Sequence, residues 1–310
     1  MIAVDIQNLT KAYRNNIAVK DLSLRIEANQ IFGFVGPDGA GKTSLFRILC
    51  GILTPTSGKV SVLGFDVTSQ PEEIKKELGY MSQKFALYAD LTVKENIRFF
   101  ADLFNAPKRG LLERINELLH FAGLSRFQNR LAGNLSGGMK QKLALCCTLI
   151  HTPKILVLDE PTTGIDPVSR HEFWEILLTL PAQGTTVILS TAYMDEASRC
   201  DKVALMNKGQ ILRLGSPSEL KKPLDGKIFE VRGSGLYDLK RKLSALEWLD
   251  EVQVFGDRLH VKVKENVRDK GKKEIENFLT EAGFEVNVNA APPSLEDVFI
   301  DLMKENDRRG

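Results

Sequence analysis

The sequence predicts an α/β protein with a parallel sheet at its centre, followed by a smaller α+β domain. Three observations support this prediction. A glycine-rich loop at residues 36–43 lies between an apolar run at 31–35 and a helical pattern at 44–53. A second apolar run, at 155–158, ends in two acids and has the character of a strand buried on both faces. Beyond residue 222 the pattern changes to short alternating strands mixed with helices.

Bulk composition narrows the functional classes. The 310 residues are 43% hydrophobic and 26% charged, as in a soluble globular protein with room for two domains. The net charge of +2 is spread along the chain, so no nucleic-acid partner is expected. No apolar run approaches the roughly 18 residues of a membrane span, and the N-terminus lacks a leader pattern. Four cysteines without C-x-x-C spacing are expected to be reduced thiols in a cytoplasmic protein.

The first residues predict a small antiparallel sheet placed ahead of the glycine-rich loop. Residues 2–6 and 19–26 alternate apolar and polar side chains, which is the period of a half-buried strand. Tyr13 lies in the polar stretch between these two runs. Its ring is a candidate for stacking on a nucleotide base, although a loop tyrosine is more often plain surface.

The loop at residues 36–43 reads GPDGAGKT and fits the phosphate-loop (P-loop) pattern G-x-x-x-x-G-K-[ST]. Its glycines allow successive backbone N–H groups to point at phosphate oxygens, and the helix that follows adds its positive end. Lys42 is expected to bind the β- and γ-phosphates, and Thr43 to offer its hydroxyl to Mg²⁺. A glycine-rich turn without chemistry is the alternative, which the flanking strand and helix disfavour. The predicted nucleotide-binding residues are Gly36, Pro37, Asp38, Gly39, Ala40, Gly41, Lys42, Thr43 and Ser44.

A helical insert, at about 85–145, is predicted between the two halves of the core. It follows strands at 59–63 and 78–81, and the second of these leads to Gln83. Apolar residues recur at helical spacing over 93–104 and 111–122. The insert closes on LSGGMKQ at 135–141, where Ser136, Gly137 and Gly138 begin a helix and offer hydroxyl and N–H donors to an anion. A Ser-Gly-Gly cap is also common at the start of helices that bind no ligand.

Two acids follow the apolar run at 155–158. The carboxyl ends of parallel strands are where open α/β sheets bind ligands, so Asp159 is expected to hold Mg²⁺ through a water. Glu160 is expected to orient and polarise an attacking water. A surface turn with two acids is the weaker alternative. A helix at 168–180 and a buried strand at 186–190 follow, and this strand leads to Thr191-Ala192-Tyr193.

The rest of the chain divides into the end of this domain and an accessory one. The nucleotide-binding domain is predicted to span 1–222 and the small α+β domain 227–310. In the second domain, strands are expected at 228–230 and 259–263, and helices at 275–282 and 295–302. No catalytic pattern is found there.

The order of the motifs resembles the ATP-binding cassette (ABC) ATPases over residues 1 to about 222: GPDGAGKT, Gln83, LSGGMKQ, ILVLDEP and TGID. The resemblance implies that Tyr13 stacks on adenine, that Asp166 belongs to the D-loop, and that the cofactors are ATP and Mg²⁺. It assigns Gln83 to the Q-loop, with a catalytic and a Mg²⁺-binding role. Family members form head-to-tail dimers, so the signature motif at 135–141, with Ser136, is expected to serve the partner's ATP in trans.

Three further stretches, at 64–66, 79–88 and 293–299, resemble the branch that serves multidrug exporters with type-2 permeases. Within it, the likeness is to the first ATPase half of chains that carry two such halves. The resemblance implies an ATPase subunit that powers a separate integral-membrane permease, for efflux of drugs or other hydrophobic compounds. It would lie in the cytoplasm, peripheral on the inner face of the cell membrane. Gln83 and residues 84–88 would touch the permease.

Two positions depart from the family pattern. Ala192 stands where a histidine usually contacts the γ-phosphate, and Asp38 stands where asparagine is commoner. From Ala192 we expect a slow ATP site and favour a heterodimer with a second ABC ATPase chain over a homodimer, whereas Asp38 leads to no expectation. The alternatives are a subunit that binds ATP with little hydrolysis, and an ABC ATPase that acts on nucleic acid or the ribosome. Four histidines lie far from Ala192 along the sequence: His120, His151, His171 and His260.

Overall fold

The computed structural model describes residues 1–84 and 87–307. The chain forms two compact units, Met1–Pro217 and Ser218–Gly310. The division falls at the start of helix α8 (Pro217–Lys221), a few residues before the predicted end of the first domain at 222. Among the described residues, no helix combines the length and the apolar character needed to cross a membrane.

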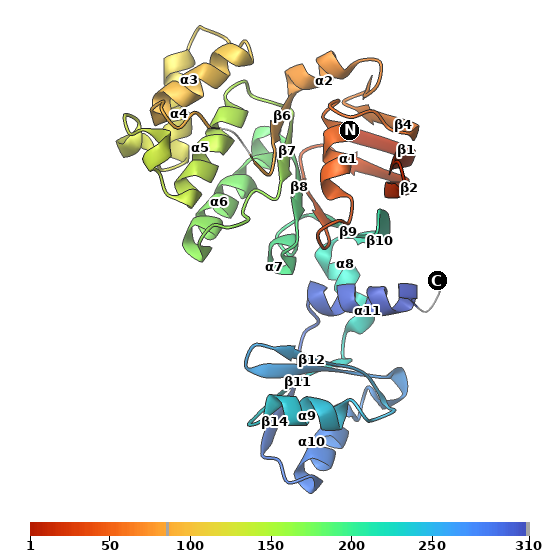
Figure 1. The fold of residues 1–310 in the computed structure, drawn as a ribbon. Coiled ribbons are helices and arrows are strands. Elements are labelled where there is room, and N and C mark those ends of the chain that lie inside the picture. The colour runs from red at the N-terminus through yellow and green to blue at the C-terminus, as the bar shows by residue number, and fades with distance from the viewer. Residues whose placement is uncertain (85–86, 308–310) are drawn as a thin grey trace. The chain divides into compact units, whose positions relative to one another are not determined.

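A six-stranded sheet forms the centre of the first unit (Figure 1). Its order is β10-β9-β3-β8-β7-β6, and all neighbours are parallel except β10 and β9. Every residue of β3, β7 and β8 is buried, which confirms the parallel sheet predicted from the apolar runs. The strands are β3 (Ile31–Val35), β6 (Leu78–Met81), β7 (Ile155–Asp159), β8 (Thr186–Thr191), β9 (Lys202–Asn207) and β10 (Gln210–Gly215).

The predicted antiparallel sheet is also present, with the order β2-β1-β4-β5. Its strands are β1 (Ile2–Tyr13), β2 (Asn16–Glu27), β4 (Ser57–Val62) and β5 (Phe65–Asp66). Tyr13 is therefore the last residue of β1, paired with Asn16, and the prediction that it lies in a loop was wrong. Register shifts between Ile6 and Lys11 break the two-residue alternation, so the pattern in the sequence stops before the strand does.

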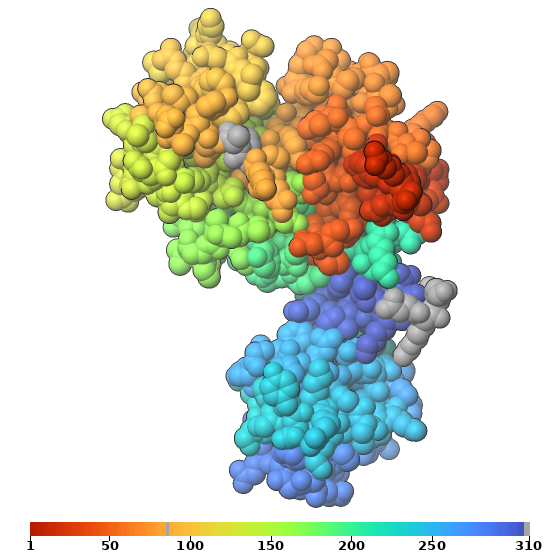
Figure 2. Space-filling view, viewed as in Figure 1, coloured from red at the N-terminus to blue at the C-terminus, as the bar shows by residue number. Residues whose placement is uncertain are grey.

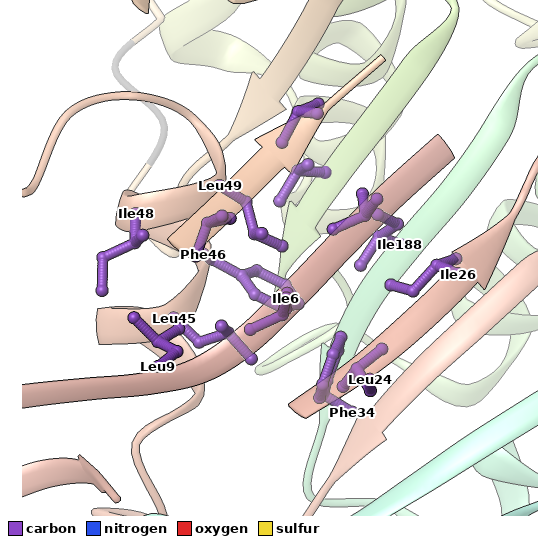
Figure 3. Close-up of a cluster of buried hydrophobic side chains, with 14 of the residues drawn as sticks. Ile6, Leu9, Leu24, Ile26, Phe34, Leu45, Phe46, Ile48, Leu49 and Ile188 are labelled. Atoms are coloured by element: carbon purple, nitrogen blue, oxygen red, sulfur yellow. The ribbon is translucent and has the colours of Figure 1, made fainter. Parts of the chain in front are cut away.

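The two sheets share one hydrophobic core with the helix that follows the phosphate loop, α1 (Lys42–Leu49). Figure 3 shows this cluster, in which side chains of the helix meet side chains from both sheets: Ile6, Leu9, Leu24, Ile26, Phe34, Leu45, Phe46, Ile48, Leu49 and Ile188. The helix was predicted to reach residue 53. It ends earlier because Gly51 adopts a left-handed conformation (φ +62°) that breaks the helical path.

The helices between α1 and α8 lie around the sheets (Figure 1), and those within residues 93–179 form a helical region at one side of the six-stranded sheet. They are α2 (Pro71–Glu77), α3 (Val93–Leu103), α4 (Leu111–Phe121), α5 (Gly137–Leu149), α6 (Pro167–Thr179) and α7 (Met194–Ala197), with short 3-10 turns at Ser125–Phe127, Ala132–Asn134 and Pro181–Gln183. The bounds of α3 and α4 lie within one residue of the prediction. The start of α3 is set by a capping box between Thr92 and Glu95. Positions 85 and 86, where the predicted insert begins, lie outside the described residues.

Figure 2 shows the space-filling surface in the same view as Figure 1. Within the first unit, the helical region in yellow and green forms one mass, and the antiparallel sheet with α1 and α2 in red and orange forms another.

All four cysteines of the chain are buried free thiols.

The second unit has its own sheet and its own core, in agreement with the predicted α+β class. Its antiparallel sheet has the order β12-β13-β11-β14. The elements are β11 (Ile228–Gly233), α9 (Leu236–Leu243), β12 (Leu249–Phe255), β13 (Arg258–Val263), α10 (Gly271–Glu281), β14 (Val286–Ala290) and α11 (Leu295–Asp307), with 3-10 turns at Lys222–Leu224 and Glu265–Val267. The core lies between the sheet and the helices α9 and α10, and includes Val231, Leu239, Val261, Ile275 and Leu279.

Candidate functional site

The phosphate loop connects β3 to α1 and is held against its neighbours by backbone contacts. A Cβ atom on Gly36 would lie 2.1 Å from the Met206 carbonyl oxygen, and one on Gly41 would lie 2.1 Å from the Ala18 carbonyl oxygen. No side chain fits at either position. The Gly209 N–H also donates to the Ala40 carbonyl at 3.1 Å. Strands β9 and β2, which carry Met206 and Ala18, therefore fix the path of the loop.

The N-terminus of α1 faces a cavity that the phosphate loop lines. Gly41 is the N-cap residue, with φ +101°, and within the described chain no side chain caps the helix. The first N–H groups of a helix lie beyond the reach of its own carbonyls, and the helix dipole adds positive potential at this end. The arrangement suits an anion such as a phosphate.

Lys42 joins the loop to the acid at the end of β7. Its side chain is only 3% exposed. Its Nζ donates to the carbonyl oxygens of Gly36 (2.8 Å) and Pro37 (3.1 Å), and lies 3.2 Å from Glu160 Oε1. The other carboxylate oxygen of Glu160 accepts a hydrogen bond from Gln83 Nε2 at 3.0 Å. Three residues predicted from separate motifs thus meet at the carboxyl ends of β6 and β7.

Asp159 is buried beside Glu160 and has one oxygen satisfied. Its Oδ1 accepts from Ser190 Oγ at 2.7 Å, and Ser190 Oγ in turn accepts from the Glu160 N–H at 2.9 Å. Among the described residues, Asp159 Oδ2 has no hydrogen-bond partner although it is buried. Glu160 adopts a left-handed backbone (φ +50°), which turns the chain out of the strand immediately after Asp159.

Asp159 lies close enough to the Cys50 thiol and the Tyr80 hydroxyl to shift the pKa of each. Burial raises the pKa of the Cys50 thiol well above its ordinary value, and the negative charge of Asp159 raises it further. Burial also raises the pKa of the Tyr80 hydroxyl, again with a contribution from Asp159. A buried carboxylate interacts strongly with a nearby cation, because little water is present to screen its charge.

A cavity of about 400 Å³ collects most of the predicted nucleotide-binding residues. Its lining is Tyr13, Asn16, Ala18, Asp38, Gly39, Ala40, Gly41, Lys42, Thr43, Ser44, Gln83 and Glu160. Tyr13 is 42% exposed at one end of it, with its hydroxyl 3.4 Å from Ser44 Oγ. Gly36 and Pro37 are not among these lining residues and instead supply the carbonyls that hold Lys42.

The signature stretch lies apart from this cavity. Ser136 is the N-cap of α5, and its Oγ accepts from the Met139 N–H at 3.3 Å. Ser136 and Gly137 are exposed, whereas Gly138 is buried where α5 packs on α6. None of the three is among the described residues that line the cavity. Gly137 instead lines a second cavity of about 340 Å³, which also reaches Gln83.

The turn after β8 carries the predicted departure from the family pattern. Ala192 is exposed there and offers only a methyl group. The neighbouring ring of Tyr193 packs on the guanidinium of Arg170, 4.2 Å from its centroid. Of the four histidines, His151 contacts the Leu78 carbonyl and His260 pairs with Asp297 in the second unit. Among the described residues, no histidine lines the cavity around Lys42.

Sequence reasoning missed two groups in this region. Ser190 bridges Asp159 and the Glu160 backbone, and Glu196 lies buried behind the turn after β8. A polar residue at the end of an otherwise apolar strand was the available signal for Ser190. A single acid in a polar segment gave no comparable signal for Glu196.

Comparison with known proteins agrees with this geometry. A family model described as ABC transporter matches residues 19–163. The chain is 40% identical over 288 residues to the probable multidrug ABC transporter ATP-binding protein YbhF of Escherichia coli. The aligned residues are 92% of this chain and 49% of YbhF. It therefore spans about half the length of that relative. It is 35% identical over 306 residues to the Nod factor export ATP-binding protein I of Rhizobium etli, covering 97% of this chain and 93% of that protein.

Solved structures give the same result for the fold. The ATP-binding cassette MJ0796, in a dimeric post-hydrolysis state bound to ADP and Pi, aligns with a TM-score of 0.63 at 26% identity, covering 69% of this chain and 98% of that one. CbiO1 from Clostridium perfringens, part of the ABC transporter complex cbiONQ, aligns with a TM-score of 0.65 at 26% identity. The alignment covers 71% of this chain and 90% of that one. The resemblance inferred from the motifs is confirmed: this chain belongs to the ATP-binding proteins of ABC transporters.

Proposed function

We propose that this chain binds ATP with Mg²⁺ and hydrolyses it as the energy-supplying subunit of an exporter whose membrane permease is a separate chain. The observation that carries the proposal is the meeting of Lys42, Gln83 and Glu160 in one cavity with the phosphate loop. The names of the relatives, a multidrug transporter protein and a Nod factor export protein, support export as the direction. The transported compound, a drug or another hydrophobic molecule, would be selected by the permease.

Within the cavity, each residue has a distinct role in this proposal. Tyr13 stacks on the adenine ring, and the N–H groups of residues 39–44 hold the phosphates. Lys42 places its positive charge on the β- and γ-phosphates. Glu160 orients the attacking water and accepts its proton, with Gln83 fixing one carboxylate oxygen. These groups act by position and charge, which is what phosphoryl transfer requires of a protein.

The residues fit Mg²⁺. The ion prefers oxygen ligands and usually keeps several waters, so few protein groups are needed. The unpartnered, buried Oδ2 of Asp159 is the donor expected for a water-mediated contact. Thr43 Oγ1 and the side-chain oxygen of Gln83 complete the proposed set. When bound, the ion neutralises charge on the phosphates.

A second ABC ATPase chain is proposed as the partner, in a heterodimer. Ser136 and Gly137 are exposed and lie outside the cavity of their own chain, which supports action in trans on a partner's nucleotide. Ala192 supports a slow site on this chain, since a methyl group cannot hydrogen-bond a phosphate. Tyr193 offers no replacement in this structure, because it is not among the described residues that line the cavity and its ring packs on Arg170. An asymmetric pair would let the partner supply the faster site.

The proposed location is peripheral, on the inner face of the cell membrane. The permease would dock at residues 84–88, of which 85 and 86 lie outside the described residues. Tyr88 at the end of this segment is 48% exposed, and its ring lies 4.5 Å from that of Phe99. Co-purification from the native membrane tests both partners: a permease and a second ATPase should accompany this chain. Salt-sensitive binding to DNA or ribosomes instead would favour the nucleic-acid alternative, which the spread net charge of +2 disfavours.

Steady-state ATPase activity tests the asymmetric mechanism. Loss of one preorganised donor to the developing charge costs about a hundred- to a thousandfold in rate. The single chain should therefore bind ATP and hydrolyse it slowly, and Ala192→His should raise the rate if the turn keeps its geometry. In the assembled pair, Ser136→Arg should reduce activity more than Glu160→Gln. Rapid hydrolysis by the single chain, abolished by Glu160→Gln, would refute the asymmetry.

A further inference from the structure

Glu196 is a buried acid behind the turn that follows β8. It lies in α7 and is 1% exposed. Its Oε1 accepts from Thr162 Oγ1 at 2.5 Å, and its Oε2 accepts from Thr191 Oγ1 at 2.7 Å. The Nε of Arg170 lies 3.5 Å from Oε1, as an ion pair without hydrogen-bond geometry. Three separate segments therefore converge on one carboxylate.

Two of these segments end at the proposed hydrolysis site. Thr162 lies two residues after Glu160, in a turn closed by the Thr163 N–H donating to the Glu160 carbonyl at 3.2 Å. Thr191 ends β8, and its Oγ1 accepts from the Tyr193 N–H at 3.0 Å, which shapes the turn that carries Ala192. Glu196 thus holds the turn after Glu160 and the turn after β8 at a fixed separation.

The third segment extends the connection to the signature helix. Arg170 lies near the start of α6, directly after Ser169. Ser169 is the residue against which Gly138 of α5 packs most tightly. A second contact between the same helices joins Lys142 to Glu172 at 2.6 Å. A displacement of Arg170 would therefore reach the start of α5, where Ser136 is exposed.

Stability alone does not account for a buried carboxylate at this position. Removing a charge from water is costly, and well-packed apolar residues often stabilise a core as well as a buried ion pair does. What a fully hydrogen-bonded acid adds is a fixed geometry among its partners. We propose that Glu196 is a positioning residue, which sets the turn carrying Glu160 relative to the turn carrying Ala192 and to α6. This inference rests on the proposed hydrolysis, although part of its test does not.

Hydrogen–deuterium exchange of the full chain without nucleotide gives a readout independent of activity. In Glu196→Gln, the amides of Thr163 and Tyr193 should exchange about tenfold faster, since a charge-assisted anchor of both turns is lost. The matched control is Glu175→Gln in α6, where the acid is 60% exposed and pairs only with His171 among the described residues. The control should leave both exchange rates unchanged. Unchanged rates in Glu196→Gln would overturn the proposal.

The kinetic test uses the full chain and separates binding from hydrolysis. A misplacement of about 1 Å can cost about a hundredfold in rate, so kcat of Glu196→Gln should fall about 10- to 100-fold while the Kd for Mg-ATP stays nearly unchanged. Thr162→Val removes one donor at constant shape and should lower kcat in the same direction. Thr162→Ser keeps the hydroxyl and should restore the wild-type rate.

The following outcomes distinguish the positioning role of Glu196 from the proposed ATP hydrolysis. If Glu196→Gln lowers only the unfolding midpoint and keeps wild-type kcat and KM, the acid is structural and the positioning role is refuted. If Thr162→Val and Thr162→Ser behave alike, the hydroxyl contact is not what positions the turn, and the proposal is refuted as well. If the wild-type protein hydrolyses no ATP, alone or with its partner, the proposed function fails while faster exchange in Glu196→Gln still supports the positioning role.

Discussion

Replacing Gly138 by alanine should destabilise the first unit through the contact between α5 and α6. A Cβ atom at this position would lie 2.2 Å from Ser169 Oγ and 2.3 Å from Ser169 Cβ. Ordinary contact begins at 3.4 Å, so the second distance is about 1.1 Å too short. The hydroxyl of Ser169 can rotate away, but its Cβ is attached to the backbone. The start of α6 must therefore move by about 1 Å, or the helices must separate.

The size of the effect follows from two opposing terms. Overpacking of a tight contact costs about 1–3 kcal/mol, whereas alanine in a helix is about 0.5–1 kcal/mol more favourable than glycine. The net loss is about 0.5–2 kcal/mol, which lowers the midpoint of urea unfolding by about 0.3–1 M. Far-UV circular dichroism of the full chain measures it. Gly137→Ala is the matched control, because its Cβ would meet only Ile165 Cγ2 at 3.8 Å, and its midpoint should not fall.

Second-site variants identify the atom responsible. Ser169→Ala removes the hydroxyl and keeps Cβ, so it should not rescue Gly138→Ala. Ser169→Gly removes both atoms and should restore most of the lost stability, apart from the cost of a second glycine in a helix. A wild-type midpoint for Gly138→Ala would refute the reasoning. Equal rescue by Ser169→Ala and Ser169→Gly would show that the backbone-attached carbon is not the obstacle.

Three other predictions concern binding, pH and the second unit. Lys42→Ala should abolish tight Mg-ATP binding in a folded protein, since the charge for the phosphates is gone; unchanged affinity by calorimetry would contradict the assignment of the phosphate loop. Burial lowers the pKa of His151, and its contact with the Leu78 carbonyl opposes this only partly. Below its ordinary value of 6.5 the unfolded chain therefore binds protons that the folded chain does not, and stability should fall as the pH drops from there towards the lowered pKa. His151→Phe should flatten that slope in urea midpoints measured across the range. Deleting residues 218–310 should leave ATP affinity nearly unchanged, because every described residue lining the cavity lies in the first unit; loss of affinity in a folded, shortened protein would exclude this division of roles.

The elements that the sequence predicted well carry local signals. The helix α3 has an apolar period and a capping box at Thr92 and Glu95, so both its type and its start are written in adjacent residues. The strand β7 is a short apolar run too brief for a helix. The strand β1 was predicted only in part, because its register shifts after Ile6 remove the alternation on which the prediction depended.

The candidate site was predictable to the extent that residue types imply roles. Lys42 and Glu160 were identified by motif, but their mutual contact at 3.2 Å depends on how β3 and β7 are ordered in the sheet. Ser190 reaches Asp159 because parallel pairing sets these two residues side by side at the ends of β8 and β7. Glu196 has partners 5 to 34 positions away in the chain. Contacts of this kind arise from tertiary packing, which a motif does not encode.

The backbone contacts of the phosphate loop bear on the entropy of ligand binding. Fixing the backbone of one residue costs about 1–2 kcal/mol in lost conformational freedom. In this protein the loop loses that conformational freedom when the chain folds, because Gly36 and Gly41 lie directly against the carbonyls of Met206 and Ala18. A loop that is already ordered has little freedom left to lose when a ligand arrives, so the attraction between its N–H groups and an anion is not offset by ordering. If the loop binds an anion as proposed, the two glycines would raise its affinity, because the loop without ligand already has little conformational freedom to lose.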